Sequence, residues 1–430
     1  MATKACADEA APNPFAPSLH HWRLHFLKVP FRAGHVLMFD IDRLEQLGDT
    51  ILRRREQSTG ELASGLDLLG FAFGEFGLGE SLRGLANACV VGGIPFSVRD
   101  LEIRTFARQA DRSMEPYLAE KPKHRCSLYC MNPDMVSPFR QLMSEAGRAG
   151  IYGIGYWYWE LEHLPGEWTD ALGRFDEIWV ASEFVAEAVR RSSTIPVIKV
   201  PPPIEVKLAR AYRRSDFRLP ENRFLFLFSF DFNSASSRKN PGGAVAAFRK
   251  AFDHGRRDVG LVLKCVHATR QLDKLHALED AIGGDDRIIL LNESLSRDQV
   301  SGLESVVDAY VSLHRSEGLG LGLAESMYLG KPVIGTAYSG NLEFMNEDNS
   351  CLVGFQLVPV GKGEYLYDDA RFRWAEPDTE QAARHMRRLV DDQAFRQRIA
   401  HQGQVAIRTR FTPSVTAGLI RHRLAELGLL

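Results

Sequence analysis

Two glutamates eight positions apart mark the segment of this sequence that is best suited to do chemistry. Glu317 follows an apolar run, and Glu325 lies in the helix predicted to begin among Gly318, Gly320 and Gly322. Three glycines at a helix start cost stability, which favours a close approach of a ligand to the backbone. Carboxylates beside free helix N–H groups predict a site for sugar or ribose hydroxyls together with a phosphate. The alternative is a solvated pair of glutamates.

A basic pair, Arg238 and Lys239, stands just before another predicted helix, in the loop after a predicted strand. Two adjacent cations at a helix start are suited to neutralising a diphosphate as it leaves. The alternative is two solvated basic residues in a loop.

A third loop, 74–80, carries Gly74, Gly77 and Gly79 between a predicted strand and a predicted helix. Such a turn lets backbone N–H groups approach an anionic or hydroxyl-rich ligand. Its spacing is not the G-x-G-x-x-G of dinucleotide-binding proteins, and a turn without a ligand remains open. A nicotinamide-dependent oxidoreductase built on this loop would need an acidic residue about 20 positions further on, and Asp100 stands there.

Short apolar runs separated by helix-length segments must position these loops. The predicted strands are 66–73, 126–130, 151–158, 177–181, 224–230, 260–266, 287–291, 309–313 and 332–335. Runs that are apolar throughout indicate parallel sheets buried on both faces, with ligands at the carboxyl ends of the strands. We therefore predict an α/β fold of two Rossmann-like doubly wound domains facing across a cleft.

Three consecutive prolines, 201–203, divide the two sets of strands, because they continue neither a helix nor an interior strand. The predicted organisation is an amino-terminal extension of unknown role (1–65), a first domain (66–200) and a linker (201–222). A second domain (223–410) and a terminal helix (411–430), which could cross back to the first domain, complete it.

The composition is that of an ordinary globular protein. The 430 residues include 53 Lys and Arg against 55 Asp and Glu, a formal net charge of −2. This balance argues against a protein that holds nucleic acid by bulk positive charge. No apolar run approaches the roughly 20 residues of a membrane helix, and no secretion signal opens the chain. We expect a cytoplasmic protein.

The end of the chain is locally basic. Residues 381–430 contain nine arginines and three acidic residues. An amphipathic basic surface can rest on anionic lipid, so peripheral contact with the inner face of a membrane is one interpretation. A solvated helix face is the other.

Taken together, these motifs resemble the retaining glycosyltransferases of family 4, which have the GT-B fold. Glu317 to Glu325 is similar to their E-x7-E motif. Segments 175–179, 238–241, 330–334 and 339–341, with Ser182, also look like that family, and the likeness covers roughly residues 66–430.

The resemblance implies a role for each motif. Glu317 would contact hydroxyls of the donor sugar, Glu325 the nucleotide ribose and Lys239 a phosphate. Gly77 and Gly79 would close over the diphosphate from the first domain. The backbone amides that would bind the diphosphate from the second domain are those of Gly318, Leu319, Gly320 and Leu321.

This sequence departs from the family at two places. Residues 231–233 stand where the family has a Gly-Arg pair, so that Arg238 is the only arginine close by to replace it. The first-domain histidine near the sugar also has no clear match. The residues that could line the sugar or acceptor site are Trp157, Trp159, Glu160 and His163, and a buried strand end is the alternative for this cluster.

The implied function is transfer of a hexose, with retained configuration and without a metal or other cofactor. The donor would be a nucleotide-diphosphate sugar. The acceptor would be a hydroxyl of a glycan or lipid-linked glycan, in bacterial surface polysaccharide or lipopolysaccharide synthesis. A metal-binding D-x-D triplet exists at Asp40 and Asp42, but we interpret it as coincidental because it lies in the extension. Alternatives are the oxidoreductase and a glycan-binding GT-B protein without turnover.

Overall fold

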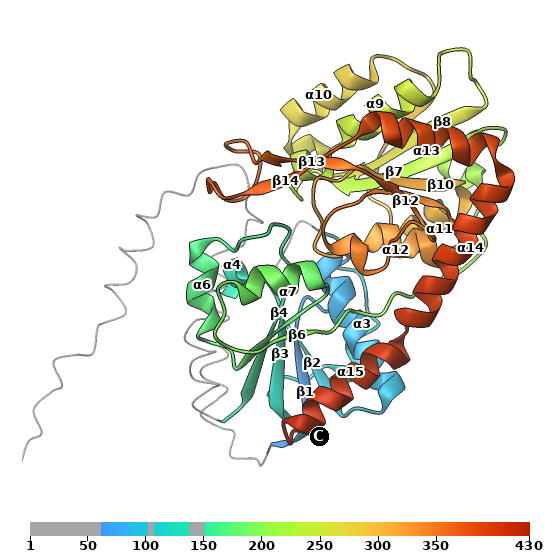
Figure 1. The fold of residues 1–430 in the computed structure, drawn as a ribbon. Coiled ribbons are helices and arrows are strands. Elements are labelled where there is room, and N and C mark those ends of the chain that lie inside the picture. The colour runs from blue at the N-terminus through green and yellow to red at the C-terminus, as the bar shows by residue number, and fades with distance from the viewer. Residues whose placement is uncertain (1–61, 102–106, 137–149) are drawn as a thin grey trace, which may run out of the picture. The chain divides into compact units, whose positions relative to one another are not determined.

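Two parallel sheets of six strands organise the protein. The computed structural model describes residues 62–101, 107–136 and 150–430. The strand order is β2-β1-β3-β4-β5-β6 in the first sheet and β12-β11-β10-β7-β8-β9 in the second (Figure 1). The predicted α/β class with two parallel sheets is confirmed.

All nine predicted strands are present, and the structure adds β2, β6 and β12 to the two sheets. The first sheet comprises β1 (Ala63–Gly70), β2 (Phe96–Asp100), β3 (His124–Cys130), β4 (Tyr152–Trp157), β5 (Glu177–Val180) and β6 (Val197–Lys199). The second comprises β7 (Phe224–Asp231), β8 (Val259–Val266), β9 (Ile288–Asn292), β10 (Ala309–Ser312), β11 (Val333–Thr336) and β12 (Cys351–Val353). The three added strands are all edge strands.

Helices connect the strands of each sheet. Around the first sheet these are α3 (Gly77–Gly92), α4 (Pro133–Val136), α6 (Gly166–Leu172) and α7 (Glu183–Arg190). The later helices are α8 (Ser236–Lys239), α9 (Pro241–Ala251), α10 (Leu272–Ile282), α11 (Arg297–Val306), α12 (Leu321–Tyr328), α13 (Thr379–Asp391), α14 (Gln393–Arg410) and α15 (Pro413–Glu426). Short 3-10 turns are η1 (Glu115–Tyr117), η3 (Arg214–Phe217), η4 (Ala268–Arg270) and η5 (Gly340–Glu343).

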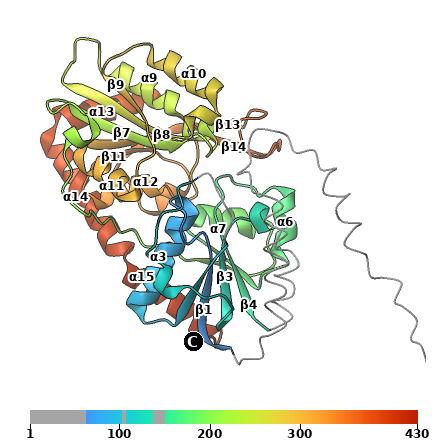
Figure 2. The same ribbon diagram turned by 180° about the vertical axis from the view of Figure 1, so that it is seen from behind.

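The helix α15 packs against α3 beside the first sheet, although α14 before it covers the second (Figures 1 and 2). A Cβ atom at Gly92 would lie 2.7 Å from Ala417 Cβ, so the two helices are in close contact. Arg423 Nη2 bonds Glu177 Oε2 at 2.6 Å, and the Glu177 side chain is fully buried. The first hydrophobic core therefore includes the last described helix.

A two-stranded antiparallel hairpin also joins this core from the second half of the chain. It consists of β13 (Phe355–Pro359) and β14 (Arg373–Pro377). Tyr365, Phe372 and Trp374 of the hairpin and its loop are buried in the core of the first sheet. The hairpin was not predicted from the sequence.

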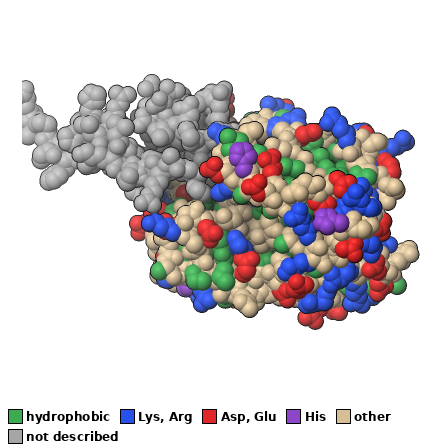
Figure 3. Space-filling view, turned by 90° about the horizontal axis from the view of Figure 1, so that it is seen from above, with side chains coloured by type: hydrophobic (Ala, Val, Ile, Leu, Met, Phe, Trp, Pro, Cys, Tyr) green, Lys and Arg blue, Asp and Glu red, His purple; other side chains and the backbone are tan. Residues whose placement is uncertain are grey.

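Charged side chains of both signs are interspersed on the face of the molecule drawn in Figure 3. This pattern agrees with the formal net charge of −2. Within residues 62–101, 107–136 and 150–430, no helix is long and apolar enough to cross a membrane.

Candidate active site

Glu317 lies in the loop that follows β10, at the carboxyl edge of the second sheet. Its N–H donates to Ser339 Oγ at 2.8 Å, and its carbonyl oxygen accepts the N–H of Gly340 at 2.9 Å. The Glu317 side chain is 11 % exposed. Because the loop after β11 fixes its backbone, the carboxylate of Glu317 has a defined position.

The basic pair from the loop after β7 meets this carboxylate. Lys239 Nζ lies 2.5 Å from Glu317 Oε1, and Arg238 Nη1 lies 3.1 Å from Glu317 Oε2. Both cations belong to α8, a single turn at the carboxyl end of β7. The structure therefore brings together the three residues predicted to be catalytic.

The two cations determine the charge of Glu317. Burial raises the pKa of this carboxyl group, but Lys239 and Arg238 outweigh burial and hold the pKa of Glu317 at about 2. Burial lowers the pKa of Lys239, against the opposing effect of Glu317. The pKa of Arg238 is lowered by burial but raised overall by the carboxylates of Glu160 and Glu317. At neutral pH Glu317 is thus a carboxylate beside a charged guanidinium.

Arg238 is held on several sides and still has a free donor. Its Nη1 donates to the Ser316 carbonyl oxygen at 2.7 Å, and its Nη2 donates to the Ser234 carbonyl oxygen at 3.3 Å. Its Nε is buried and has no hydrogen-bond partner among the described residues. A buried donor without a partner costs about 1–3 kcal/mol. This N–H is therefore suited to an anionic oxygen of a ligand.

Glu160 of the first domain reaches the same cluster. Its Oε1 lies 3.5 Å from Arg238 Nη2. Its carbonyl oxygen accepts the hydroxyl of Ser316, next to Glu317. Of the four residues predicted to line the sugar or acceptor site, Glu160 contacts the predicted catalytic residues.

The side chains of the two tryptophans of that prediction lie in the first hydrophobic core. Trp157 and Trp159 are at most 1 % exposed and pack against Trp168 in the first core. Because α6 and the hairpin bury this strand end, the structure favours the alternative of a buried strand end for the two tryptophan side chains. His163 is half-buried, and its carbonyl oxygen accepts the indole N–H of Trp159. No contact within the described part of the chain joins its side chain to Glu317.

The glycines between Glu317 and Glu325 shape one turn between β10 and α12. Gly320 has a φ of 90° as the N-cap of α12, a conformation that favours glycine. A Cβ at Gly318 would lie 3.2 Å from the Trp159 carbonyl oxygen, and one at Gly322 would lie 2.7 Å from Tyr310 Oη. Leu319 is buried beneath the turn, and Leu321 begins α12. Packing alone thus accounts for these glycines, and diphosphate binding by this turn stays a prediction.

Glu325 is already paired in the structure. Arg297 Nη2 lies 2.5 Å from Glu325 Oε1, and Arg297 Nε lies 3.6 Å from Glu80 Oε2 of α3. Burial lowers the pKa of Arg297, but the carboxylates of Glu325 and Glu80 raise it overall. Neither Arg297 nor the role of Glu80 was predicted from the sequence. Two sequence features could have indicated them. Glu80 stands at the end of the glycine-rich loop 74–80, and Arg297 follows Ser296, the N-cap of α11.

The two glycines of the first domain differ in their surroundings. A Cβ at Gly79 would lie 2.1 Å from the Gly74 carbonyl oxygen, so the tight turn itself requires glycine there. A Cβ at Gly77 would meet nothing within 4 Å. Gly77, at the N-terminus of α3, is therefore the position of this loop that the fold leaves free for a ligand.

Asp100, the acidic residue that the oxidoreductase hypothesis would need, has a structural role. The Asp100 carboxylate accepts the N–H of Ala72 at 2.8 Å and so supports the loop after β1. Asp40 and Asp42 lie outside the described residues. Among the residues that are described, no cluster of three or more His, Cys, Asp or Glu side chains could hold a metal ion.

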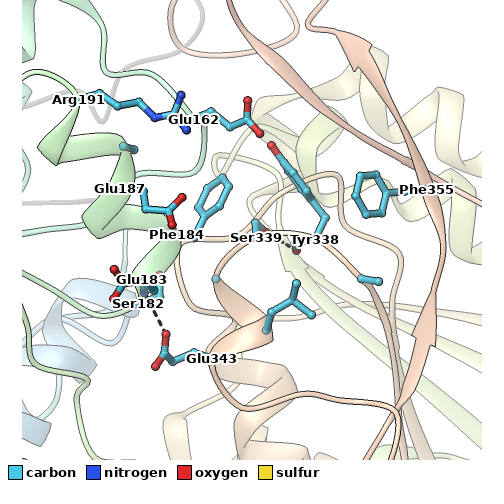
Figure 4. Close-up of a pocket in the computed structure, with 14 residues that line it drawn as sticks. Glu162, Ser182, Glu183, Phe184, Glu187, Arg191, Tyr338, Ser339, Glu343 and Phe355 are labelled. Carbon is cyan, nitrogen blue, oxygen red and sulfur yellow. Dashed lines mark hydrogen bonds between the residues drawn. The ribbon is translucent and has the colours of Figure 1, made fainter.

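A cavity of about 380 Å³ adjoins the Glu317 loop. Residues of α7 and of the loop after β11 line it, together with Glu162 and Phe355. The side chains of Glu162 and Tyr338 point toward each other across it (Figure 4). Ser182, on its wall, donates to the Gly318 carbonyl oxygen at 2.6 Å. The cavity thus shares a wall with the turn that carries Glu317.

The segment that carries this cluster can be compared with known families. Residues 213–405 match the family model of glycosyl transferases, group 1. The match includes Arg238, Lys239, Glu317 and Glu325 and all six strands of the second sheet. No curated protein gives a significant match to the chain.

Solved structures resemble nearly the whole described fold. The sucrose-phosphate synthase of Thermosynechococcus elongatus has a TM-score of 0.59 at 15% identity, over 85% of this chain and 99% of that one. HepE of Anabaena, in complex with UDP-glucose, has a TM-score of 0.61 at 13% identity, over 84% of this chain and 100% of that one. The two sheets and these similarities show the GT-B fold.

Proposed function

We propose that this protein is a retaining glycosyltransferase that uses a nucleotide-diphosphate sugar and needs no metal ion. The observation that carries the proposal is the Glu317 carboxylate between Lys239 and Arg238 at the carboxyl ends of β10 and β7. The match of residues 213–405 to the group 1 family model supports it. A carboxylate suits sugar hydroxyls, and two cations suit a departing diphosphate.

In the proposed reaction, the bond between the anomeric carbon and the β-phosphate oxygen breaks, and its electron pair leaves with the diphosphate. Arg238 and Lys239 stabilise this negative charge. The acceptor hydroxyl oxygen forms the new bond from the same face, and its proton passes to the departing phosphate oxygen. Glu317 orients the sugar through its hydroxyls.

The same proposal covers the nucleotide end of the donor, the identity of the acceptor and the place of action. Glu325 would bind the ribose once Arg297 shares or leaves it, since the two are 2.5 Å apart. Because HepE is described in complex with UDP-glucose, a UDP-hexose is our first choice of donor. We propose a glycan or lipid-linked glycan of a bacterial surface polysaccharide as acceptor, and a cytoplasmic site of action. The nine arginines of residues 381–430 support peripheral contact with anionic membrane.

The test is a thermal-shift screen against UDP-glucose, GDP-mannose and other nucleotide sugars, followed by measurement of nucleotide release. A donor that binds only the folded protein raises its stability by RT ln(1 + [L]/Kd). We expect Glu317→Gln and Lys239→Met each to lower nucleotide release by about a hundredfold. Lys207→Met is the matched control, because the Lys207 side chain is 82% exposed.

Wild-type release rates in both Glu317→Gln and Lys239→Met would contradict the proposal. Binding of a donor without release, in the presence of glycan acceptors, would instead favour a binding protein. A change in nicotinamide absorbance would favour the oxidoreductase.

A further inference from the structure

The loop between β13 and β14 brings a tyrosine from the second half of the chain to the candidate site. Tyr365 is 3 % exposed, and its ring packs against Trp159 at a centroid distance of 5.6 Å. Its hydroxyl donates to Glu160 Oε2. Burial raises the pKa of Tyr365 well above its ordinary value, and the Glu160 carboxylate adds to this. The hydroxyl therefore keeps its proton and remains a donor.

The other oxygen of Glu160 faces Arg238. Glu160 Oε1 lies 3.5 Å from Arg238 Nη2, and Arg238 Nη1 lies 3.1 Å from Glu317 Oε2. A continuous series of polar contacts thus runs from the hairpin loop through Glu160 to the guanidinium and the carboxylate of the site. The side chain of Arg238 is 5 % exposed, so bulk water contributes little to its placement.

We propose that Tyr365 is a positioning residue, which orients the Glu160 carboxylate and through it holds Arg238 where a departing diphosphate develops charge. The inference rests on the proposed function. Ser316 holds only the backbone of Glu160, through its carbonyl oxygen. Without the tyrosine hydroxyl the carboxylate can rotate about its side-chain bonds, and Arg238 loses its contact from the first domain.

Loss of the Tyr365 hydroxyl should weaken binding of the charged leaving group more than binding of the intact donor. In UDP-glucose the bridging oxygen carries little charge, whereas free pyrophosphate and UDP carry the charge that bond cleavage creates. A misplaced Arg238 should therefore weaken binding of pyrophosphate and lower kcat, with little change in the KM for UDP-glucose.

The hairpin supplies a matched control. Tyr367 lies two residues from Tyr365, and its hydroxyl accepts the indole N–H of Trp168 at 3.1 Å. This bond also joins the hairpin loop to the first domain, but the contacts of Tyr367 do not include Glu160 within the described structure. Tyr365→Phe and Tyr367→Phe each remove one hydroxyl from the loop, so a difference between them separates positioning of Arg238 from general loosening.

The experiment measures the Kd of inorganic pyrophosphate by calorimetry and the turnover of UDP-glucose, with the full chain. We expect Tyr365→Phe to weaken pyrophosphate binding and to lower kcat by roughly five- to tenfold each, while the KM for UDP-glucose changes by less than about twofold. Tyr367→Phe should leave all three within about twofold. In a Glu160→Ala background, Tyr365→Phe should have no further effect on pyrophosphate binding, because the residue through which it acts is gone.

The outcomes separate the inference from the proposed function. If Tyr365→Phe behaves as Tyr367→Phe does, or acts equally in the Glu160→Ala background, the inference is wrong whether or not UDP-glucose is turned over. A wild-type protein that does not bind pyrophosphate would also overturn it. If the expected pattern of pyrophosphate binding appears but no nucleotide sugar is turned over, the inference holds and the proposed function fails.

Discussion

Two clusters of buried charged side chains in this protein are paired in different ways. At the candidate site one carboxylate, Glu317, is shared by two cations, and the buried Nε of Arg238 has no partner among the described residues. Asp285 and Arg287, before β9, form a closed pair in which each side chain is 1 % exposed. Two contacts join the side chains, Nη2 to Oδ2 at 2.8 Å and Nε to Oδ1 at 2.9 Å, and the Arg287 N–H donates to Oδ1 at 3.1 Å. The second arrangement is suited to stability and the first to binding.

The closed pair predicts a pH-dependent stability. The hydrogen bond from Arg287 lowers the pKa of Asp285 from 3.8 to about 2. A carboxyl whose pKa is depressed by folding stabilises the protein fully above its unfolded pKa, and this stability is lost as pH falls toward the folded value. We expect Asp285→Asn to lower the free energy of unfolding by about 2–3 kcal/mol at pH 7, and its difference from wild type to shrink between pH 4 and pH 2.

Urea denaturation across this pH range is the measurement. The control is Asp286→Asn, because Asp286 and its partner Arg257 are 61% and 59% exposed. Such a surface pair contributes less than about 1 kcal/mol. A pH-independent difference between wild type and Asp285→Asn would contradict the argument.

Single residues also show what the sequence could reveal about the site. Glu317, Arg238 and Lys239 were predictable, because each stands where a strand ends next to a helix start. Arg297 was not, since it pairs with Glu325 from a different helix and only the fold brings the two together. The sequence left two interpretations of Trp159 open, because an aromatic residue at a strand end has the same sequence pattern in a core as in a binding site.

At the scale of elements, the turn from β1 into α3 contains two glycines that the fold uses differently. Gly79 is required by packing, since a Cβ there would lie 2.1 Å from a backbone oxygen. Gly77 has open space around it at the helix N-terminus. Substitutions at Gly77 and Gly79 can therefore distinguish a glycine that a ligand needs from one that the fold needs.

We expect Gly79→Ala to lower the free energy of unfolding by about 2 kcal/mol or more, because backbone must move. Gly77→Ala should stay within about 1 kcal/mol of wild type, because alanine suits a helix. If Gly77 closes over the diphosphate, as the resemblance implies, Gly77→Ala should nevertheless weaken UDP binding. Chemical denaturation and UDP calorimetry on both variants test this, and unchanged UDP affinity in Gly77→Ala would remove Gly77 from the site.

The strands that were not predicted from the sequence lack a long apolar run. The edge strands β2 and β6 have one neighbour each, so they carry polar residues such as Arg99 and Lys199 and do not form apolar runs. The hairpin β13–β14 is short, and its anchor Tyr365 is buried only through contacts with a distant part of the chain. A continuous apolar run predicts a strand even at an edge, as for β9, whereas strands without such a run are determined by contacts between distant segments.

At the scale of the whole molecule, the second half of the chain supplies two parts of the first core. The hairpin contributes Trp374, and α15 contributes Ile420 and Leu424, all at most 1 % exposed. Arg423 adds its bond to the buried Glu177. The two sheets are therefore expected to unfold together rather than as independent domains.

Thermal unfolding followed by two probes tests this coupling. All five described tryptophans lie in the first core, so their fluorescence reports on it, whereas far-UV circular dichroism also reports on α9 to α14. We expect the two probes to give the same midpoint temperature. Arg423→Met should lower the midpoint from each probe equally, by about 2–4 °C per kcal/mol of unfolding free energy lost. Lys207→Met, whose side chain is 82% exposed, is the control. A fall of the fluorescence transition alone would contradict the coupling.

The position of α15 affects how the first domain folds during synthesis on the ribosome. Synthesis runs from the first sheet to the second, and the N–H of Gly65 finds its partner, the Leu429 carbonyl oxygen, only when the last described residues emerge. Until then the first domain exposes the apolar surface that Ala417, Ile420 and Leu424 later cover. The nascent first domain should therefore be a client of holdase chaperones from the synthesis of β6 until α15 emerges.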